Sequence, residues 1–570
     1  MSTLNDSNVP RDVIPGTIHL VNIQIEEIDG QRHIELVPTP SSDPEDPLNW
    51  APKRKLISMI MVNVYTALIG IALTVQYSVL ADITRDTGIS TASLVEGTGL
   101  MFLFLGWGCL VWQPIALTYG RRGVYIISSL LCVPLLVWTA YSKTTADWYA
   151  HRILVGLAGS PIESVPEMSI PDVHFAHDRG MWMAIYVFTL FASNFLAPVI
   201  AGWLALAAGW RWVMNFGAIC AGVATLALFF FMEETKYFRN TLEGVSDGAA
   251  DPPAENVHIK REGDPEARCT AREDVGDGTD THSAEKLEIN KACEPENQCT
   301  GAGFTAIIAP TKKTFMQRMK LFANMPGQPT FAETIRTAHL PLVLLFQFPN
   351  VVWAGLIYGI NLSLYNVLNA TTSPILSAPP YSWSSGLVGT VYVGPIIGAA
   401  LGSLWSGKVA DAYTLYLARR NGGIREAEQR LWPLAVSAVL SAVGLILWGV
   451  GAAHGIHWVG LAFGSGILTF SAVTGGSIAL SYNVDCFKDI SGPSTTTVII
   501  IRNTIGFAIS YGITPWYTNM GLTGCFTMAG VLSMACTLTF LIMIWKGKAM
   551  RKFCAPRYWK YVGEGLMRHP

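Results

Sequence analysis

The feature that most constrains this chain is a series of apolar stretches, each about as long as a helix that crosses a lipid bilayer. Such a helix needs about 20 mostly apolar residues, because the hydrocarbon offers no water to satisfy a non-helical backbone. Twelve stretches qualify: residues 56–80, 94–117, 123–142, 148–170, 181–207, 212–232, 341–367, 384–407, 433–453, 456–481, 494–517 and 521–545. The sequence therefore predicts an all-α membrane protein with twelve transmembrane helices in two six-helix halves.

Composition supports this fold class and excludes other kinds of protein. Charged residues make up 14% of the 570 residues, whereas a soluble domain carries about 25%. The net charge of −2 gives no basic surplus for binding nucleic acid. The chain has no phosphate-binding Gly-x-x-x-x-Gly-Lys-Ser/Thr motif, no His-Glu-x-x-His and no Gly-x-Ser-x-Gly, so we expect neither an ATP-driven pump nor an enzyme. The ten cysteines include no Cys-x-x-Cys pair, and we expect no metal site and no cofactor.

The polar segments divide the chain into five parts. We expect an N-terminal tail, a first half, a central linker, a second half and a C-terminal tail, with bounds 1–55, 56–232, 233–340, 341–545 and 546–570. Within the linker, residues 241–302 are too polar to bury an apolar core and are predicted to be disordered. Residues 312–336 mix basic and apolar residues, so they form either an amphipathic helix on the inner leaflet or a solvated linker.

Basic residues gather in alternate connections, which fixes the expected orientation in the membrane. Arg121 and Arg122 follow the second span, and Arg419 and Arg420 follow the eighth, whereas the intervening connections carry few cations. Lysine and arginine are enriched on the cytoplasmic side of membrane proteins. We therefore predict a multi-pass protein with both termini and the linker in the cytoplasm.

Short motifs near the ends of the spans carry a resemblance to a known family. They occupy residues 43–50, 120–123, 152–156, 197–202, 233–237 and 407–411. In this order and at these positions they resemble the fungal major facilitator superfamily, in its twelve-span drug:proton antiporter branch. The subgroup with an opening like residues 43–50 also includes polyamine and cation permeases. The resemblance covers almost all of the chain outside the linker.

The resemblance implies the major facilitator fold and secondary active transport by alternating access. The implied function is proton-coupled export of small organic molecules such as drugs, toxins or secondary metabolites. Proton-coupled import of polyamines or other organic cations is the alternative. The implied partners are a small-molecule substrate, a proton and the lipid bilayer, and the implied protein is a monomer in the plasma membrane.

Two motifs of the resembled family concern gating between the halves. The loop with Arg121 and Arg122 is expected to latch the halves together, although Leu117 stands where the family has an aspartate. In the second half, Asp411 keeps the acidic position and is expected to pair with Arg419 or Arg420 or with the other half. Charges that set only the topology are the alternative.

The fifth span carries a second gating motif, with Pro198 and Gly202 in an otherwise small-residue stretch. Small residues let helices approach closely, and a proline bends its helix. In the resembled family this motif marks exporters, whereas ordinary small-residue packing is the alternative.

The fourth span holds the charged residues that we predict to carry the chemistry. Arg152, Glu163 and Glu167 lie within or near the bilayer, where charges are costly and usually functional. Glu163 and Glu167 share a helix face, and Arg152 lies on nearly the same side. We predict that Glu163 carries the proton or binds a cationic substrate. The alternative is a structural role in which the glutamates bind arginines of the eleventh span or of a loop.

Uncharged polar residues and one more arginine complete the candidate site. Those expected to face a central cavity are Asn63, Gln76, Tyr77, Asn350, Tyr358, Asn361, Tyr365, Arg502 and Asn503. Interhelical hydrogen bonding is the alternative for the polar side chains. Arg502 either snorkels to the cytoplasmic interface or pairs with a carboxylate or the substrate. Asn369 begins a glycosylation sequon in the external loop predicted after the seventh span, very close to the bilayer.

Overall fold

The computed structural model describes residues 14–19, 27–28, 31–32, 43, 45–237, 318–322, 334 and 338–563, apart from the side chains of a few of them. All of these belong to one compact unit. The predicted disorder of residues 241–302 and most of the predicted amphipathic segment 312–336 lie outside the described residues, so both stay predictions.

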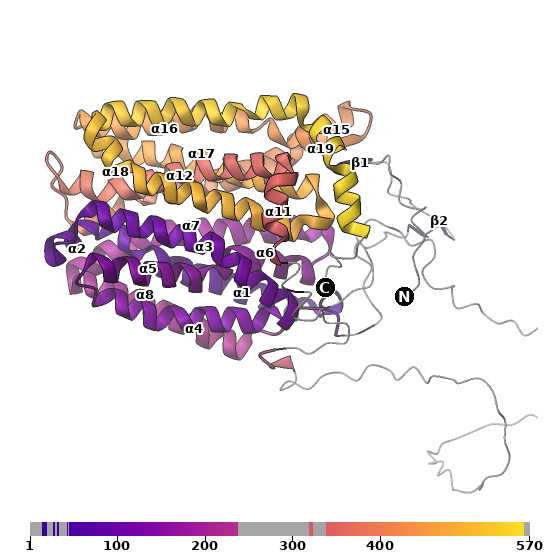
Figure 1. Cartoon of the computed structure of the whole chain (residues 1–570), viewed down its shortest axis with the longest axis horizontal. Coiled ribbons are helices and arrows are strands. Elements are labelled where there is room, and N and C mark those ends of the chain that lie inside the picture. Colours follow the sequence, from indigo (N-terminus) through magenta and orange to yellow (C-terminus); the bar gives the residue numbers. More distant parts are fainter. Residues whose placement is uncertain are drawn as a thin grey trace, which may run out of the picture. The chain divides into compact units, whose positions relative to one another are not determined.

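The first half is a bundle of long helices with short connections (Figure 1, indigo to magenta). Its helices are α1 (Pro52–Thr74) with the 3-10 turn η2 (Val75–Ser78), α2 (Leu80–Thr87), α3 (Thr91–Tyr119), α4 (Arg121–Ala140), α5 (Thr145–Gly159), α6 (Pro161–Val173), α7 (Ala176–Ala208) and α8 (Trp210–Phe231). The side chains of Ser90 and Thr144 accept bonds from free backbone N–H groups and so begin α3 and α5. Gly209, with φ of 85°, ends α7 in a conformation that favours glycine.

The second half repeats this layout (Figure 1, orange to yellow). Its elements are α11 (Leu340–Gln347), α12 (Pro349–Ser377), α13 (Ser385–Thr390), α14 (Val393–Leu404), the π-helical turn η3 (Trp405–Val409), α15 (Ala410–Arg420), η4 (Ala427–Leu431), α16 (Leu434–Ala453), α17 (Trp458–Cys486), η5 (Lys488–Ile490), α18 (Ser491–Leu538) and α19 (Phe540–Gly563). Short antiparallel pairs join β1 (Thr17–His19) to β4 (Ile424–Glu426) and β2 (Glu27–Ile28) to β3 (Gln31–Arg32).

Ten helices among the described residues are long and apolar enough to cross a membrane, which agrees with the twelve predicted spans once two features are considered. The long helix α18 contains a reversal at Gly521, with φ of 72°, and therefore holds two spans. The fourth span is broken at Ser160, where Pro161 begins a new helix, so that neither α5 nor α6 is long enough alone. The all-α fold of two six-helix halves is confirmed.

The seventh span lies further along the chain than predicted. Residues 341–367 were expected, but α11 ends before Pro349 and the long helix α12 then continues to Ser377. Its polar end stays helical because the hydroxyls of Thr371 and Thr372 donate to backbone carbonyls one turn earlier, at 2.8 and 2.6 Å. Asn369 is consequently buried inside α12, so its placement in an external loop, and with it the glycosylation site, is wrong.

The two halves meet along two pairs of helices in which small residues permit close approach. The helix α3 packs on α18, and α7 packs on α13 and α14. At the second contact, a Cβ atom added to Gly202 would lie 2.3 Å from the carbonyl oxygen of Ser385, and one added to Gly389 would lie 2.5 Å from that of Pro198. The predicted motif at Pro198 and Gly202 is therefore a point where one half touches the backbone of the other.

One chain segment links both halves at the end that we predict to be cytoplasmic, called the inner end below. Thr334 of the linker shares a hydrogen bond of 2.5 Å with Thr118 at the end of α3. Six residues later α11 begins, and there the hydroxyl of Thr497 on α18 donates to the carbonyl of Pro341 at 2.7 Å. The linker thus binds the first half shortly before it enters the second.

A larger side chain at Gly202 should weaken the contact between the halves. We expect Gly202→Val to lower the free energy of unfolding by about 1–3 kcal/mol, because the added side chain meets rigid backbone. The melting temperature of the detergent-solubilised protein measures this. Gly512→Val is the matched control, since a Cβ atom at that helical glycine has no neighbour within 4 Å. Equal shifts for the two variants would contradict the packing described here.

Candidate functional site

The centre of the candidate site is a network of buried polar groups that joins the two halves. Glu163 of α6 forms an ion pair with Arg502 of α18, and its second carboxylate oxygen accepts a hydrogen bond of 2.7 Å from the amide of Asn503. Arg502 also donates to the hydroxyl of Tyr358 on α12 at 3.0 Å. Glu163, Arg502 and Asn503 are each at least 93% buried. The pairing of Arg502 with a carboxylate, one of its two predicted alternatives, is therefore observed, and snorkelling is wrong.

The break in the fourth span explains why a carboxylate is stable at this depth. Pro161 begins α6, which places Glu163 in the first turn of the helix. The first turn of a helix is the positive end of its dipole, which favours a negative charge. The sequence thus positions an anion by interrupting a membrane helix, and Arg502 supplies the countercharge.

Glu167 differs from Glu163 although it lies only one turn further along α6. Among the described residues, no hydrogen bond or ion pair of its carboxylate is found, and its side chain is only partly buried. Arg502 is still close enough to act on it electrostatically, as is Glu163. The site therefore holds one carboxylate in a fixed pair and a second that is available to exchange partners.

An internal cavity lies beside this network and is lined by helices from both halves. Its polar wall consists of Glu163, Arg502, Thr74, Asn194, Tyr358, Tyr365 and Asn366. The remaining lining comes largely from apolar side chains of α1, α3, α6 and α7, including Phe102 and Phe191. Apolar walls with a few charged or polar groups are typical of sites for small organic molecules, whose pockets measure about 300–1,000 Å³. This cavity measures about 40 Å³, so such a molecule fits only after the helices around it move apart.

Three residues of this wall, Thr74, Asn194 and Asn366, were missed by sequence reasoning. Asn366 lies eight residues after Tyr358 and inside the predicted seventh span, so helical spacing could have placed both on one face. Asn194 is a single polar residue in the apolar fifth span, where no repeated spacing marks it.

Several predicted cavity residues instead hold neighbouring helices together. Asn63 donates to the carbonyl of Met59 and accepts from Thr189, at 2.8 and 2.9 Å. Asn361 donates to the hydroxyl of Thr537 on α18 at 3.5 Å as well as to the carbonyl of Ile357 in its own helix at 2.9 Å. Asn350 donates to the hydroxyl of Tyr482 on α17 at 2.9 Å. For Asn63, Asn350 and Asn361, interhelical packing describes the structure better than cavity lining. Helical spacing identified a face, but not what that face meets.

Arg152 precedes Glu163 by eleven residues, about 16 Å along the span, so the two side chains do not meet. Its guanidinium sits 4.4 Å from the ring centre of Trp148 and donates to the sulfur of Met101 at 3.7 Å. Met101 lines the same cavity as Glu163, and the prediction that Arg152 lies on nearly the same side as the glutamates stays a prediction. Tyr77 neighbours Arg152, and Gln76 is fully buried beside it in η2; neither lines the cavity.

Arg121 and Arg122 bind acidic partners from two other segments, because their own loop has none at the motif position. The guanidinium of Arg121 pairs with Asp172 at the end of α6 at 2.7 Å, and both side chains are buried. The carboxylate of Glu234 accepts hydrogen bonds from the backbone N–H groups of Arg121 and Arg122, at 2.9 and 3.1 Å. Carboxylates from two other segments thus replace the aspartate that Leu117 removes.

The matching loop of the second half has a similar charge cluster. Asp411 pairs with Arg430, which also contacts Asp485 at the end of α17 at 3.1 Å. The predicted pairing of Asp411 with Arg419 or Arg420 is wrong. Residues 410–420 form the helix α15, which carries both arginines about 12–14 Å along its axis from Asp411.

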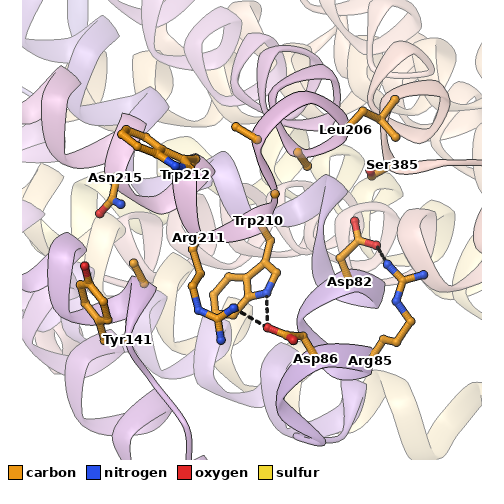
Figure 2. Close-up of a pocket in the computed structure, with 14 residues that line it drawn as sticks. Asp82, Arg85, Asp86, Tyr141, Leu206, Trp210, Arg211, Trp212, Asn215 and Ser385 are labelled. Carbon is orange, nitrogen blue, oxygen red and sulfur yellow. Dashed lines mark hydrogen bonds and ion pairs between the residues drawn. The ribbon is translucent and has the colours of Figure 1, made fainter.

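A second and larger cavity, of about 730 Å³, opens at the opposite end of the bundle (Figure 2). There Asp86 accepts a hydrogen bond from the indole of Trp210 at 2.8 Å and pairs with Arg211 at 2.6 Å. Arg85 pairs with Asp82 at 2.7 Å. Its lining includes none of the predicted site residues, and its charges are paired with each other. We therefore locate the candidate site in the smaller internal cavity.

Comparison with known proteins agrees with the fold and the charge motifs. A model of the Major Facilitator Superfamily matches residues 62–492. An uncharacterised MFS-type transporter of Schizosaccharomyces pombe is 28% identical, over 93% of this chain and 90% of its own length. Protein HOL1 of Saccharomyces cerevisiae is 27% identical, over 95% of each chain. Efflux pump FUBT of Fusarium oxysporum is 23% identical, over 83% of this chain and 70% of its own.

Among solved structures, the xylose transporter XylE of Escherichia coli is similar with a TM-score of 0.53. The similarity covers 86% of this chain and 98% of XylE at 10% identity, so it concerns the fold alone.

Removing one partner of the buried ion pair should lower the free energy of unfolding more than removing both partners. We expect Arg502→Gln to lower the free energy of unfolding by about 3–5 kcal/mol, because the charge of Glu163 is then buried without a partner. The double variant Glu163→Gln and Arg502→Gln should recover part of this loss. Melting temperatures of the purified variants test this, with Arg211→Gln at a half-exposed pair as control, where about 1 kcal/mol or less is expected. A double variant less stable than Arg502→Gln would contradict the pairing.

Lys236, close to Arg121 and Glu234, should give stability a dependence on alkaline pH. Burial lowers its pKa to about 8, and the positive charge of Arg121 contributes to the decrease. Between pH 8 and 10.5 the unfolded chain therefore holds a proton that the folded chain has lost, so stability should rise with pH in this window. Unfolding of Lys236→Met at several pH values should lack that rise. Lys53→Met, at an exposed lysine, should keep it, and an unchanged slope in Lys236→Met would disprove the assignment.

Proposed function

The chain belongs to the Major Facilitator Superfamily, and on this basis we propose that it is a proton-coupled exporter of small organic molecules that works by alternating access. Two halves that rock about a central site near the midplane give such transport. The observation that carries the proposal is Glu163 of α6, which lines the internal cavity and is bound to the opposite half, with Glu167 one turn further along the same helix.

The ion pair provides a way to couple protonation to movement of the halves. Glu163 belongs to the first half, whereas Arg502 and Asn503 belong to the second, so any opening of this seam must break their contacts. A charge pair in low-dielectric surroundings separates only if a proton or another ion replaces the lost partner. Neutralising the carboxylates therefore favours states in which the halves are apart at this level.

We assign proton exchange to Glu167 and a latch role to Glu163. Arg502 and Asn503 bind both carboxylate oxygens of Glu163, which stands in the first turn of α6. Glu167 has no such partner among the described residues, and a proton or a cation can reach it without first breaking the pair. When Glu167 is protonated, Arg502 interacts with Glu163 alone. When Glu167 is ionised, its carboxylate competes with that of Glu163 for the guanidinium of Arg502.

Export is supported by the contact of Pro198 and Gly202 with α13 and by the name of one relative, the efflux pump of Fusarium oxysporum. The apolar lining of the cavity suits neutral or weakly basic organic molecules. We also propose that both termini face the cytoplasm, that the protein acts as a monomer and that it resides in the plasma membrane.

Import of polyamines or other organic cations is the second candidate. The observation in its favour is Glu167, because a carboxylate without a fixed cation attracts an ammonium group. Tyr358 and Tyr365, which line the cavity, can add cation–π contacts.

Transport in proteoliposomes under an imposed pH gradient tests the proposal. The substrates are a cationic dye, spermidine and a neutral polyketide. We expect at least one to move against the proton flow, which identifies an exporter. Movement of spermidine with the proton flow would favour the second candidate, and transport indifferent to the gradient would contradict proton coupling.

The two glutamates should differ in their effect on this transport. We expect Glu167→Gln to lower gradient-driven transport by about tenfold or more, in the usual range of coupling between two ligands, while substrate exchange without a gradient continues. Glu163→Gln should slow both, because the latch is lost. The control is Glu96→Gln on α3, whose carboxylate accepts a bond of 2.6 Å from Tyr149 near the outer end. Unchanged gradient-driven transport in Glu167→Gln would disprove the assignment.

A further inference from the structure

The last helix of the described chain, α19, presents one stripe of side chains away from the protein. Between residues 545 and 560 the exposed positions follow a helical repeat, and the positions between them are largely buried. The stripe contains Trp545, Lys546, Ala549, Lys552, Phe553, Pro556, Arg557 and Lys560. Lys548 is also exposed, but it is paired with Glu426. The helix contains no aspartate or glutamate, so the stripe carries only positive charge.

The other face of α19 is fixed to the second half, which holds the stripe outward. Arg551 donates to the carboxylate of Glu428 at 2.8 Å and to the carbonyl of Pro15 beside β1. Cys554 and Tyr558 are buried in the core of this half. The orientation of the stripe therefore follows from tertiary packing and not from a free tail.

Aromatic side chains accompany the cations at this surface. Trp545 is 79% exposed and Phe553 63%, and the cation of Lys546 lies 5.2 Å from the ring centre of Trp545. Phe346 of the neighbouring helix α11 is 86% exposed, next to Gln347, whose carbonyl accepts a bond from Arg557. Large exposed aromatic groups beside lysine and arginine are typical of the boundary between lipid head groups and hydrocarbon.

The two helices also have the direction that a surface helix needs. Figure 1 shows α11 and the last turns of α19 lying across the inner end of the bundle, whereas the spanning helices run along it. A helix in this position lies in the plane of the membrane surface. Since α19 continues the twelfth span, its stripe begins where that span leaves the bilayer.

We propose that the exposed stripe of α19, with Phe346 of α11, binds anionic phospholipids of the cytoplasmic leaflet. Lys546, Lys552 and Arg557 contact the phosphate and carboxylate of the head groups, and Trp545, Phe553 and Phe346 insert at the acyl boundary. Positive charge just cytoplasmic of a membrane span attracts anionic lipid. The proposal shares the predicted cytoplasmic inner end with the proposed function, but it is independent of substrate, direction and proton coupling.

Lipid titration of the full chain tests this. The purified protein in a neutral detergent is titrated with fluorescent phosphatidylserine and, separately, with phosphatidylcholine. The variant replaces Lys546, Lys552 and Arg557 by glutamine. Each cation should contribute roughly a fivefold preference for the anionic lipid, so the triple variant should lose most of a roughly hundredfold preference.

The control variant replaces three other exposed cations at the same end of the protein by glutamine: Lys53→Gln, Arg420→Gln and Lys488→Gln. It should keep the preference for phosphatidylserine over phosphatidylcholine. Both triple variants must first show the melting temperature of the wild type; if the first does not, K552E alone replaces it. Equal binding of the two lipids, or a preference that the control loses and the stripe variant keeps, would overturn the proposal. So would full competition by inorganic phosphate, since it would indicate a free-anion site.

Discussion

The contact between the two halves depends on one constraint, that a fully buried carboxylate needs a countercharge. The Glu163–Arg502 pair meets it across the boundary between the halves. Coulomb attraction is strong where water is excluded, but so is the cost of desolvating each ion. The pair therefore adds little net free energy of folding, but it requires the Glu163 carboxylate and the Arg502 guanidinium to stay in contact. Because the two residues belong to different halves, this requirement restricts how the halves move relative to each other.

Much of the fold could be predicted from the sequence, because the bilayer makes hydrophobic length decisive. The positions of eleven spans agree with the prediction within a few residues, and the seventh differs because a proline and a run of polar residues altered its bounds. Polar residues inside a membrane helix mislead a hydropathy reading when their side chains bond to the helix itself, as those of Thr371 and Thr372 do.

The candidate site was predictable only in part. Glu163, Glu167 and Arg502 stand out because charge is rare inside the spans, and the structure joins two of them. Spacing along a helix could not reveal that Asn361 bonds to its own helix and to Thr537, or that Arg152 meets Trp148 and Met101. Likewise, the carboxylates that serve Arg121 come from segments 51 and 113 residues away, and no local motif connects them.

The hydrogen bond between Thr334 and Thr118 has a consequence for the range of motion. Only six residues separate Thr334 from Leu340, where the chain is already anchored on the second half. An extended chain covers at most about 3.4 Å per residue, so this leash reaches about 20 Å. While it is fastened, the inner ends of α3 and α11 cannot separate further than that. The last residues of the linker thus limit this separation for as long as the hydrogen bond between Thr334 and Thr118 holds.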